Sequence, residues 1–254
     1  MSDSVLSRLL PGFEVIDVHA HVGRWDYPGE AIDLDGFRRQ TDRIGFAKVI
    51  VSSRTALSYD VPEGNAEIAR LAEADERFHG SVIFNANNYE ESCEQIERYA
   101  DHPRFVCAKI HTCMGLAVNA PQNLRVMELL ARKKLPLTMH TWTGDGPAAA
   151  DAAKHFPDLT FFWFHALAGD YRKAAELAKD LPNVCLEFVT STQERGKVEH
   201  LVQHFDVNRI FFGTDQSLLN PVYALGPIVE ADISDADRRK ILSDNARRMF
   251  RFEK

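Results

Sequence analysis

Two histidines separated by one residue, His19 and His21, follow the apolar segment Val15-Ile16-Asp17-Val18. Residues two apart on a strand face the same side, with about 6 to 7 Å of backbone between them. Two imidazoles at this spacing can hold one metal ion, and imidazole is the commonest protein metal ligand. A pair of solvated histidines at a strand end is the alternative interpretation, and the rest of the chain decides between the two.

Other polar side chains stand where apolar segments end. They are Lys109, His111, His140, His165 and Asp215. Singly, each has a structural explanation, such as a hydrogen-bonded core histidine, a helix cap at Asp215, or a pair between Lys109 and Glu187. Together they indicate a site, because each buried polar group without a partner costs a few kcal/mol. Three or four His and Asp ligands around an open position are typical of catalytic zinc.

Short segments rich in Val, Ile and Phe alternate with amphipathic ones along the whole chain, which predicts βα units and a parallel sheet. We expect eight strands, at residues 15–20, 47–52, 80–85, 105–111, 136–141, 160–166, 184–189 and 209–213. Eight units without a linker predict one α/β domain over residues 1–254, a (β/α)8 TIM barrel, with a terminal helix at 235–252 over one barrel end. A doubly wound open sheet is the alternative fold, but no Gly-x-Gly-x-x-Gly follows the first strand.

Composition limits the partners. The formal net charge is −7 with the signs interspersed, whereas a nucleic-acid partner calls for a basic stripe. No apolar run is long enough to span a bilayer, and the four cysteines form no Cys-x-x-Cys pair, which argues against a disulfide framework or a thiolate zinc site. The N-terminal residues lack the pattern of a secretion signal. We therefore expect a cytoplasmic protein with a small-molecule substrate, and neither nucleic acid nor membrane as partner.

The chain resembles the amidohydrolase superfamily, in the amidohydrolase-related branch (amidohydrolase 2) that includes aminocarboxymuconate-semialdehyde decarboxylase. The matching segments occur in family order and are Ile16–His21, His140, His165, Phe212–Asp215 and Asn245–Phe250. This set covers nearly the whole chain and is far more specific than the histidine pair alone. Relatives in this branch often form homodimers, so a homodimer is an expected state.

The resemblance also implies a site. Four residues would bind one divalent metal ion, zinc with manganese as an alternative: His19, His21, His140 and Asp215. An open position on zinc lowers the pKa of a bound water to about 7. Asp215 would be catalytic by taking the proton of that water, and His165 would act beside it as an acid–base or charge-stabilising group.

Two departures from the family pattern qualify these expectations. Gln216 and Ser217 follow the last motif where relatives often have a proline, which changes the loop but not the ligand. The fourth strand ends in Lys109 and His111, and superfamily members with two metals can use a carbamylated lysine there as a bridge. We favour a site with one metal. In that site Lys109 would bind a substrate carboxylate or pair with Glu187, instead of bridging to a second metal.

Substrate contacts are expected from the loops after the strands. The candidates are Arg54, Asn87, Asn88, Trp142, Glu187 and Arg195, and Trp25 and Tyr27 can wall an apolar pocket. The leading function is a metal-dependent hydrolase of an amide, ester or lactone. A non-oxidative decarboxylase of an unsaturated carboxylic acid is the alternative, favoured if cations cluster at the pocket. An inactive barrel that serves as a binding module is a third hypothesis, of a different class.

Overall fold

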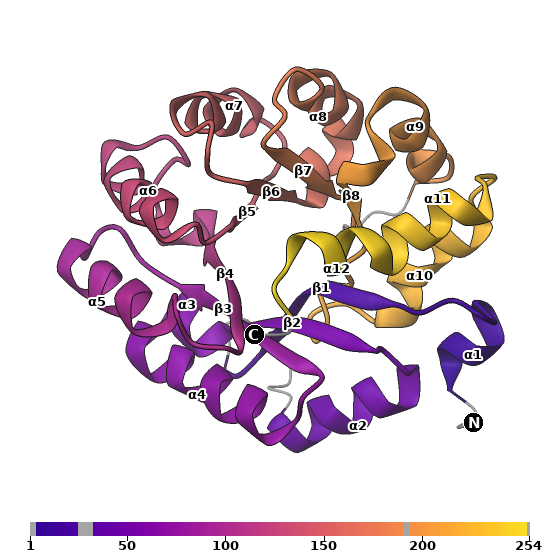
Figure 1. Cartoon of the computed structure of the whole chain (residues 1–254), viewed down its shortest axis with the longest axis horizontal. Helices are drawn as coiled ribbons and strands as arrows, with labels where there is room; N and C mark the ends of the chain where they lie inside the picture. The colour runs from indigo at the N-terminus through magenta and orange to yellow at the C-terminus, as the bar shows by residue number, and fades with distance from the viewer. Residues whose placement is uncertain (1–3, 25–32, 190–193, 253–254) are drawn as a thin grey trace.

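The computed structural model describes residues 4–24, 33–189 and 194–252, and it contains a parallel sheet in the order β1 to β8. The strands are β1 (Ile16–Val22), β2 (Lys48–Ser53), β3 (Phe78–Ile83), β4 (Phe105–Ile110), β5 (Leu137–His140), β6 (Phe161–Phe164), β7 (Val184–Glu187) and β8 (Ile210–Phe211). The segment after β8 closes the sheet, because Val18 donates its N–H to the Phe212 carbonyl (3.1 Å) and Ala20 bridges to Gln216. The predicted (β/α)8 barrel is confirmed (Figure 1).

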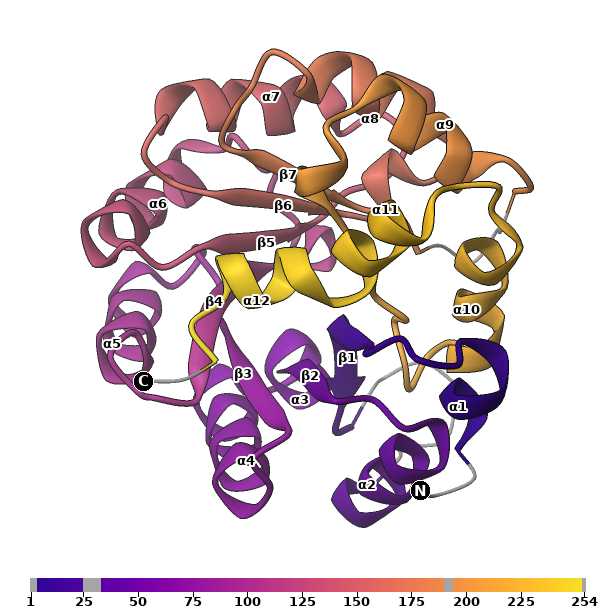
Figure 2. The same ribbon diagram turned by 45° about the vertical axis from the view of Figure 1, so that its right-hand side comes forward.

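Helices surround the sheet, as both ribbon views show (Figures 1 and 2). They are α1 (Val5–Leu9), α2 (Leu34–Ile44), α3 (Arg54–Ser58), α4 (Val61–Ala74), α5 (Tyr89–Tyr99), α6 (Pro121–Lys133), α7 (Gly146–His155), α8 (Tyr171–Ala178), α9 (Lys197–His204), α10 (Pro221–Glu230), α11 (Asp235–Arg239) and α12 (Asn245–Met249). Local signals set their ends; Asp33 caps α2 by accepting from Gly36 N, and Gly45 ends it with a left-handed φ of 96°. No helix within the described residues is long and apolar enough to cross a membrane.

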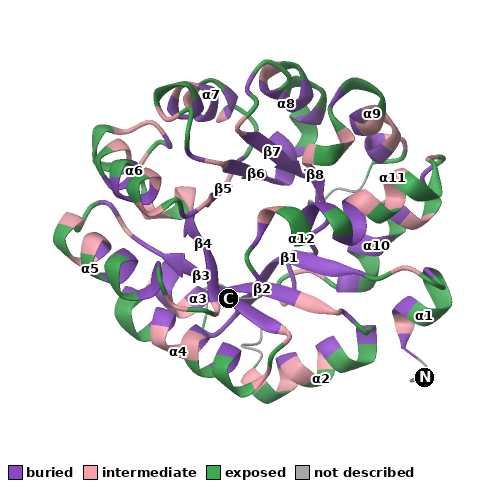
Figure 3. Ribbon diagram, in the orientation of Figure 1, coloured by how far each residue is buried: buried purple, intermediate pink, exposed green. Residues whose placement is uncertain are grey.

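The core has two parts. A larger cluster fills the layer between the sheet and the helices, and a smaller one fills the inside of the barrel. In Figure 3 the strands are almost entirely buried, while the helices expose one side. Phe164 belongs to the inner cluster and stacks against His19, with ring centroids 4.1 Å apart. The inside of the barrel is thus filled by packed side chains that support the histidine pair from below.

The C-terminal segment closes the amino end of the barrel. The predicted helix at 235–252 is observed as α11, a π-helical turn (Lys240–Asp244) and α12, and it ends at Met249 rather than at Phe252. Beyond it, Phe250 stacks on Phe162 with a centroid distance of 4.8 Å, and the Phe252 carbonyl accepts a hydrogen bond from His79 Nε2 (3.2 Å). Both phenylalanines join the inner cluster, so they plug the mouth opposite the strand ends that carry the polar residues.

Six strands, β3 to β8, end one or two residues earlier than predicted, and the last three do so for a local reason. β6 ends at Phe164 because the backbone turns left-handed at His165. β7 ends at Glu187 because the N–H of Val189 is taken by the side chain of Glu187. β8 is only two residues long, since the chain after Phe211 turns to pair with β1.

Candidate metal centre

Three side chains with metal-binding atoms converge at the carboxyl end of the barrel. His19 and His21 lie on β1, and Asp215 follows β8. The two Nε2 atoms are 3.2 Å apart, and Asp215 Oδ1 lies 3.5 Å from His19 Nε2 and 3.2 Å from His21 Nε2. All three residues are buried. The sequence prediction that these residues, separated by nearly two hundred positions, share one site agrees with this geometry.

The hydrogen bonds of the histidines set which nitrogen faces the cluster. His19 Nδ1 donates to Glu187 Oε2 (3.0 Å). His21 Nδ1 lies 3.0 Å from Ser52 Oγ, whose hydroxyl donates to the Ala20 carbonyl and can therefore accept from the ring. Burial and the charge of Lys109 lower the pKa of both histidines well below the ordinary value. Both rings are thus neutral near pH 7, with an unprotonated Nε2 directed at the other.

A divalent cation fits this arrangement. Ligand atoms about 2.0–2.2 Å from a tetrahedral zinc ion lie about 3.3–3.6 Å from one another. The three separations here are 3.2, 3.2 and 3.5 Å. Two facing nitrogen lone pairs and a carboxylate oxygen repel one another unless a cation lies among them. The donor set of neutral imidazoles and one carboxylate also suits zinc or manganese.

Lys109, at the end of β4, approaches the same atoms. Its Nζ lies 3.0 Å from His19 Nε2 and 3.3 Å from His21 Nε2, and 4.9 Å above the Phe164 ring. Burial lowers the pKa of Lys109 to about 8, against the opposing charges of Asp215 and Glu187. An ammonium group at this position would donate to the lone pairs that a metal ion needs. Lys109 therefore contacts the cluster directly, and the charge of Glu187 also acts on it.

A buried carboxylate, Asp17, joins the two strands that carry the cluster. Its Oδ1 accepts from the backbone N–H groups of His19 (3.0 Å) and Thr214 (3.0 Å). Its Oδ2 accepts from the Thr214 hydroxyl (2.5 Å) and from Gln216 Nε2 (2.9 Å). Burial raises the pKa of Asp17 to about 7. Asp17 belongs to the motif at the first strand, but sequence reasoning gave it no role, because its partners lie almost two hundred residues away.

His165 sits on a strained turn. It and the next three residues, through Ala168, have positive φ values of 45–71°, although none is glycine. Such residues cost about 1–3 kcal/mol each and cluster at functional sites. The His165 Nδ1–H donates to the Val189 carbonyl (2.7 Å), and burial lowers the pKa of the ring to about 4. His165 is thus a neutral imidazole in a fixed orientation, with its ring centroid 5.0 Å from that of His19.

His140 lies beside the cluster, not inside it. No group of metal-capable His, Cys, Asp and Glu atoms within 4.8 Å of one another includes it among the described residues. Its Nδ1 contacts the Thr112 hydroxyl (3.1 Å), and its ring lies 4.0 Å from that of His111 and 5.6 Å from that of Trp142. Burial lowers the pKa of both His140 and His111 to about 2. His140 as the fourth ligand stays a prediction.

The other predicted substrate contacts have mixed positions. Arg54 is buried at the start of α3, and its charge acts on Asp215. Trp142 is 41% exposed, and Glu187 is fully buried. Away from the cluster, Asn88 caps α5 and the exposed Arg195 pairs with Glu230 (3.0 Å), while Asn87 bonds to the Met114 carbonyl. Trp25 and Tyr27 lie outside the described residues.

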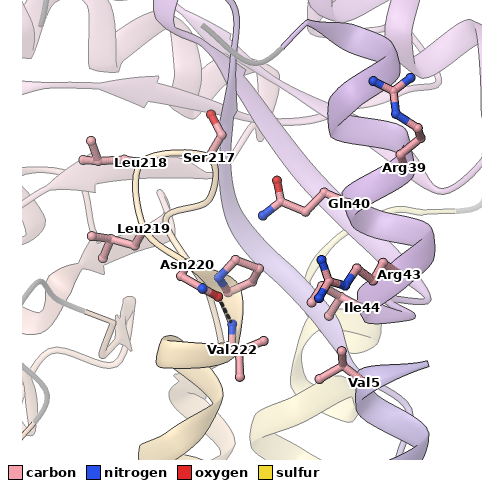
Figure 4. Close-up of a pocket in the computed structure, with 11 residues that line it drawn as sticks. Val5, Arg39, Gln40, Arg43, Ile44, Ser217, Leu218, Leu219, Asn220 and Val222 are labelled. Carbon is pink, nitrogen blue, oxygen red and sulfur yellow. Dashed lines mark hydrogen bonds between the residues drawn. The ribbon is translucent and has the colours of Figure 1, made fainter. Parts of the chain in front are cut away.

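A surface groove of about 580 Å³ lies elsewhere, between α2 and the start of α10 (Figure 4). Arg39, Gln40 and Arg43 line one side, and Leu218 and Asn220 line the other. None of the three converging residues lines it. The groove is on the outside of the barrel, so the side chains of the cluster define the candidate site rather than the groove.

Comparison with known proteins agrees with this picture. The family model described as amidohydrolase matches residues 16–252. The chain therefore belongs to the amidohydrolase family, as its motifs indicated, and it is an enzyme. No curated protein sequence matches it.

Solved structures share the fold at low identity. A 2,6-dihydroxybenzoate decarboxylase from Rhizobium has a TM-score of 0.75 at 15% identity, with 93% of this chain and 98% of that chain covered. A dihydroxybenzoic acid decarboxylase from Polaromonas, with bound manganese and the inhibitor 2-nitroresorcinol, has a TM-score of 0.74 at 16% identity, with 93% of this chain and 96% of that chain covered. A 5-carboxyvanillate decarboxylase from Sphingomonas paucimobilis has a TM-score of 0.74 at 15% identity, with 94% of this chain and 99% of that chain covered.

Proposed function

We propose that this enzyme binds one divalent metal ion at His19, His21 and Asp215 and removes the carboxylate of a planar unsaturated acid without oxidation. The observation that carries this proposal is that two buried cations, Arg54 and Lys109, lie close to Asp215. Arg54 and Lys109 both act on Asp215, and the neighbouring histidines are neutral. With a divalent cation added, such a site attracts an anionic substrate. The bound metal supplies Lewis-acid stabilisation of negative charge on substrate oxygens.

The residues of the chain then have distinct tasks. Arg54 and Lys109 can bind the substrate carboxylate. The exposed face of Trp142, which stacks on His140 at an interplanar angle of 11°, can cover a planar ring. Loss of carbon dioxide leaves an electron pair on carbon, and one proton must be added there. Burial raises the pKa of Asp215, so this residue can hold that proton, and the neutral His165 can orient the reacting group.

Hydrolysis of a carboxylate-bearing amide, ester or lactone is the second candidate. The observation that favours it is the pair of unprotonated nitrogens and one carboxylate around a single point, since this donor set also serves metal-activated water. The same cations would then bind the acid group of the substrate. The solved decarboxylase structures support the first candidate through their shared fold.

The test begins with metal content. We expect about one equivalent of zinc or manganese per chain in protein purified without chelator, and about two if Lys109 carries a bridging carbamate. A panel of hydroxybenzoates, including 2,6-dihydroxybenzoate and 5-carboxyvanillate, is then assayed for carbon dioxide release, and a panel of amides, esters and lactones for hydrolysis. Release of carbon dioxide supports the first candidate, and hydrolysis alone overturns it. The double variant His19→Ala, His21→Ala should lose metal and turnover; if both persisted, the proposed centre would be wrong.

The homodimeric state, which follows from the resemblance, and the cytoplasmic location are further proposals. Sedimentation of the purified protein at several concentrations tests the first, and a mass of one chain at all of them would contradict it.

A further inference from the structure

Glu187, the last residue of β7, is a completely buried carboxylate with three hydrogen-bond partners. Its Oε1 accepts from the Val189 N–H (2.5 Å). Its Oε2 accepts from His19 Nδ1 (3.0 Å) and from the backbone N–H of His165 (3.4 Å). One side chain therefore contacts both a proposed metal ligand and the backbone of the proposed acid–base residue.

The pattern of partners is that of an ionised carboxylate. Two are backbone N–H groups, which can only donate, and the third is the His19 ring; they come from three different places: β1, the turn after β6 and the segment after β7. An ionised carboxylate has only acceptors, so it satisfies this set without conflict. Burial raises the pKa of Glu187 well above its ordinary value, and the two backbone N–H donors and the positive charge of the buried Lys197 act against this rise. The carboxylate thus has both the donors and the opposite charge that burial requires.

The substrate cannot reach Glu187. Gly213 packs directly over the pair that Glu187 forms with His19. A Cβ added at Gly213 would lie 2.6 Å from His19 Cβ and 3.1 Å from Glu187 Cδ, and contacts that close require the neighbours to move. Glu187 itself has no exposed surface. Glu187 can therefore act only through the residues it holds.

We propose that Glu187 is a positioning residue that holds His19 in the Nδ1–H tautomer, with its Nε2 lone pair facing His21 and Asp215, and at the same time anchors the turn that presents His165. A carboxylate behind a ligating histidine fixes the ring and makes its other nitrogen a better donor, and loss of such a partner weakens metal affinity about 10- to 100-fold. The functional part of this proposal rests on the proposed metal centre. The tautomer does not, because it is a property of the metal-free protein.

The anchored turn gives Glu187 its second task. The left-handed residues at 165–168 need surrounding contacts to keep them in place. Two side chains supply them from neighbouring strand ends: Glu187 accepts from His165 N, and the Thr141 hydroxyl oxygen accepts from Leu167 N (3.3 Å). Removing Glu187 frees the first residue of the turn, whereas removing the Thr141 hydroxyl frees the third. The variant Thr141→Val is therefore a matched control that loosens the turn without touching His19.

The first experiment is nitrogen NMR of the histidine rings in metal-free protein labelled with ¹⁵N-histidine, with His19 assigned by its absence in His19→Gln. We expect His19 protonated at Nδ1 in the parent. In Glu187→Met, which is similar in size but has no acceptor, the Nδ1–H preference should be lost and the dissociation constant for zinc, measured by chelator competition, should rise at least tenfold. Glu187→Gln keeps an acceptor oxygen and should restore the tautomer. Thr141→Val should leave both the tautomer and zinc affinity unchanged.

The outcomes separate the two proposals. A parent His19 protonated at Nε2 overturns the inference, and this result needs no variant to fold. An unchanged zinc affinity in folded Glu187→Met overturns the positioning role. If the parent binds no metal while His19 is held as Nδ1–H by Glu187, the proposed metal centre fails and the structural part of the inference stands.

Discussion

Thr214 donates two hydrogen bonds to the carboxylate of Asp17, one from its backbone N–H to Oδ1 (3.0 Å) and one from its hydroxyl to Oδ2 (2.5 Å). Asp17 lies two positions before His19, and Thr214 lies directly before Asp215. This contact therefore fixes the separation of two proposed ligands. It also takes part in closing the barrel, since the segment after β8 pairs with β1 at this point.

The Thr214→Val variant removes the hydroxyl and keeps the shape. Because leaving a buried acceptor without its donor costs about 1–3 kcal/mol, we expect the free energy of unfolding in urea to fall by about that amount. Zinc affinity should fall as well, because Asp215 follows directly. Thr138→Val is the matched control, because the buried Thr138 hydroxyl donates to the Ala108 carbonyl (3.1 Å). This variant should lower the free energy of unfolding by about 1 kcal/mol and leave zinc affinity unchanged. Equal effects of the two variants on zinc binding would contradict this prediction.

Lys109→Met tests the role of the lysine in the cluster. The ammonium of Lys109 donates toward the same His19 and His21 nitrogens that a metal ion requires. Its removal should therefore tighten zinc binding at least tenfold and weaken the binding of a carboxylate substrate, seen as a raised KM. Metal content by elemental analysis and affinity by chelator competition are the measurements. A loss of metal would instead make Lys109 a ligand, as an amine or as a carbamate.

Trp142→Leu tests the aromatic wall. The ring is 41% exposed, stacks on His140 and meets the His165 ring edge-on at 5.5 Å. Aromatic contacts contribute about 0.5–1.5 kcal/mol, so KM for a planar substrate should rise about 2- to 12-fold with kcat nearly unchanged. Tyr223→Leu, at an aromatic residue 47% exposed on α10, should change neither constant. A large fall in kcat with unchanged KM would show that Trp142 acts on the reacting atoms instead.

The pH dependence of stability should reveal His79 at the amino end of the barrel. The pKa of His79 is lowered from 6.5 to about 4, mainly by burial and also by the charges of Lys48 and Arg104, against the hydrogen bond to Phe252. Between these two values the unfolded chain binds more protons than the folded chain, so stability falls as the pH falls. From pH 7 to pH 5 the loss is about 2 kcal/mol.

The variant His79→Gln keeps a donor for the Phe252 carbonyl but does not titrate. The difference in unfolding free energy between parent and variant should therefore change by about 2 kcal/mol between pH 7 and pH 5, in favour of the variant at low pH. Urea unfolding at a series of pH values measures it. A constant difference across that range would show that the His79 ring titrates equally in both states.

Much of the fold could be predicted from the sequence because strand and helix patterns are local. The eight strands were expected within a few residues of their observed bounds. The turn at His165 could not be, since Ala166 and Leu167 are good helix formers and only contacts from other strands hold them at positive φ. The end of β7 at Glu187 could not be predicted for the same reason, because a side chain takes the backbone N–H that would continue the strand.

The candidate site divides in the same way. Residue type and position at strand ends were enough to predict His19, His21 and Asp215 as neighbours. The tasks of Ser52 and Glu187 depend on which ring nitrogen faces which oxygen, and that of Asp17 depends on backbone N–H groups from two distant segments. Strand spacing carries no such information. Glu187 was expected inside the barrel as a contact for the substrate or Lys109, and it instead forms hydrogen bonds with His19 and two backbone N–H groups. The position of Asp17, a charged residue within an apolar strand and two positions before a proposed ligand, is the signal that could have indicated its role.

The plug formed by Phe250 and Phe252 also has a consequence for biosynthesis. These rings complete the inner core together with strand residues that are synthesised up to about 235 residues earlier, and the partner of His79 follows it by 173 residues. Until residues 250–252 have emerged, the apolar amino ends of the strands are exposed to water and to other nascent chains. Such late, long-range contacts slow folding and leave intermediates prone to aggregation. Production of this enzyme should therefore depend on growth temperature and chaperones more strongly than its final stability suggests.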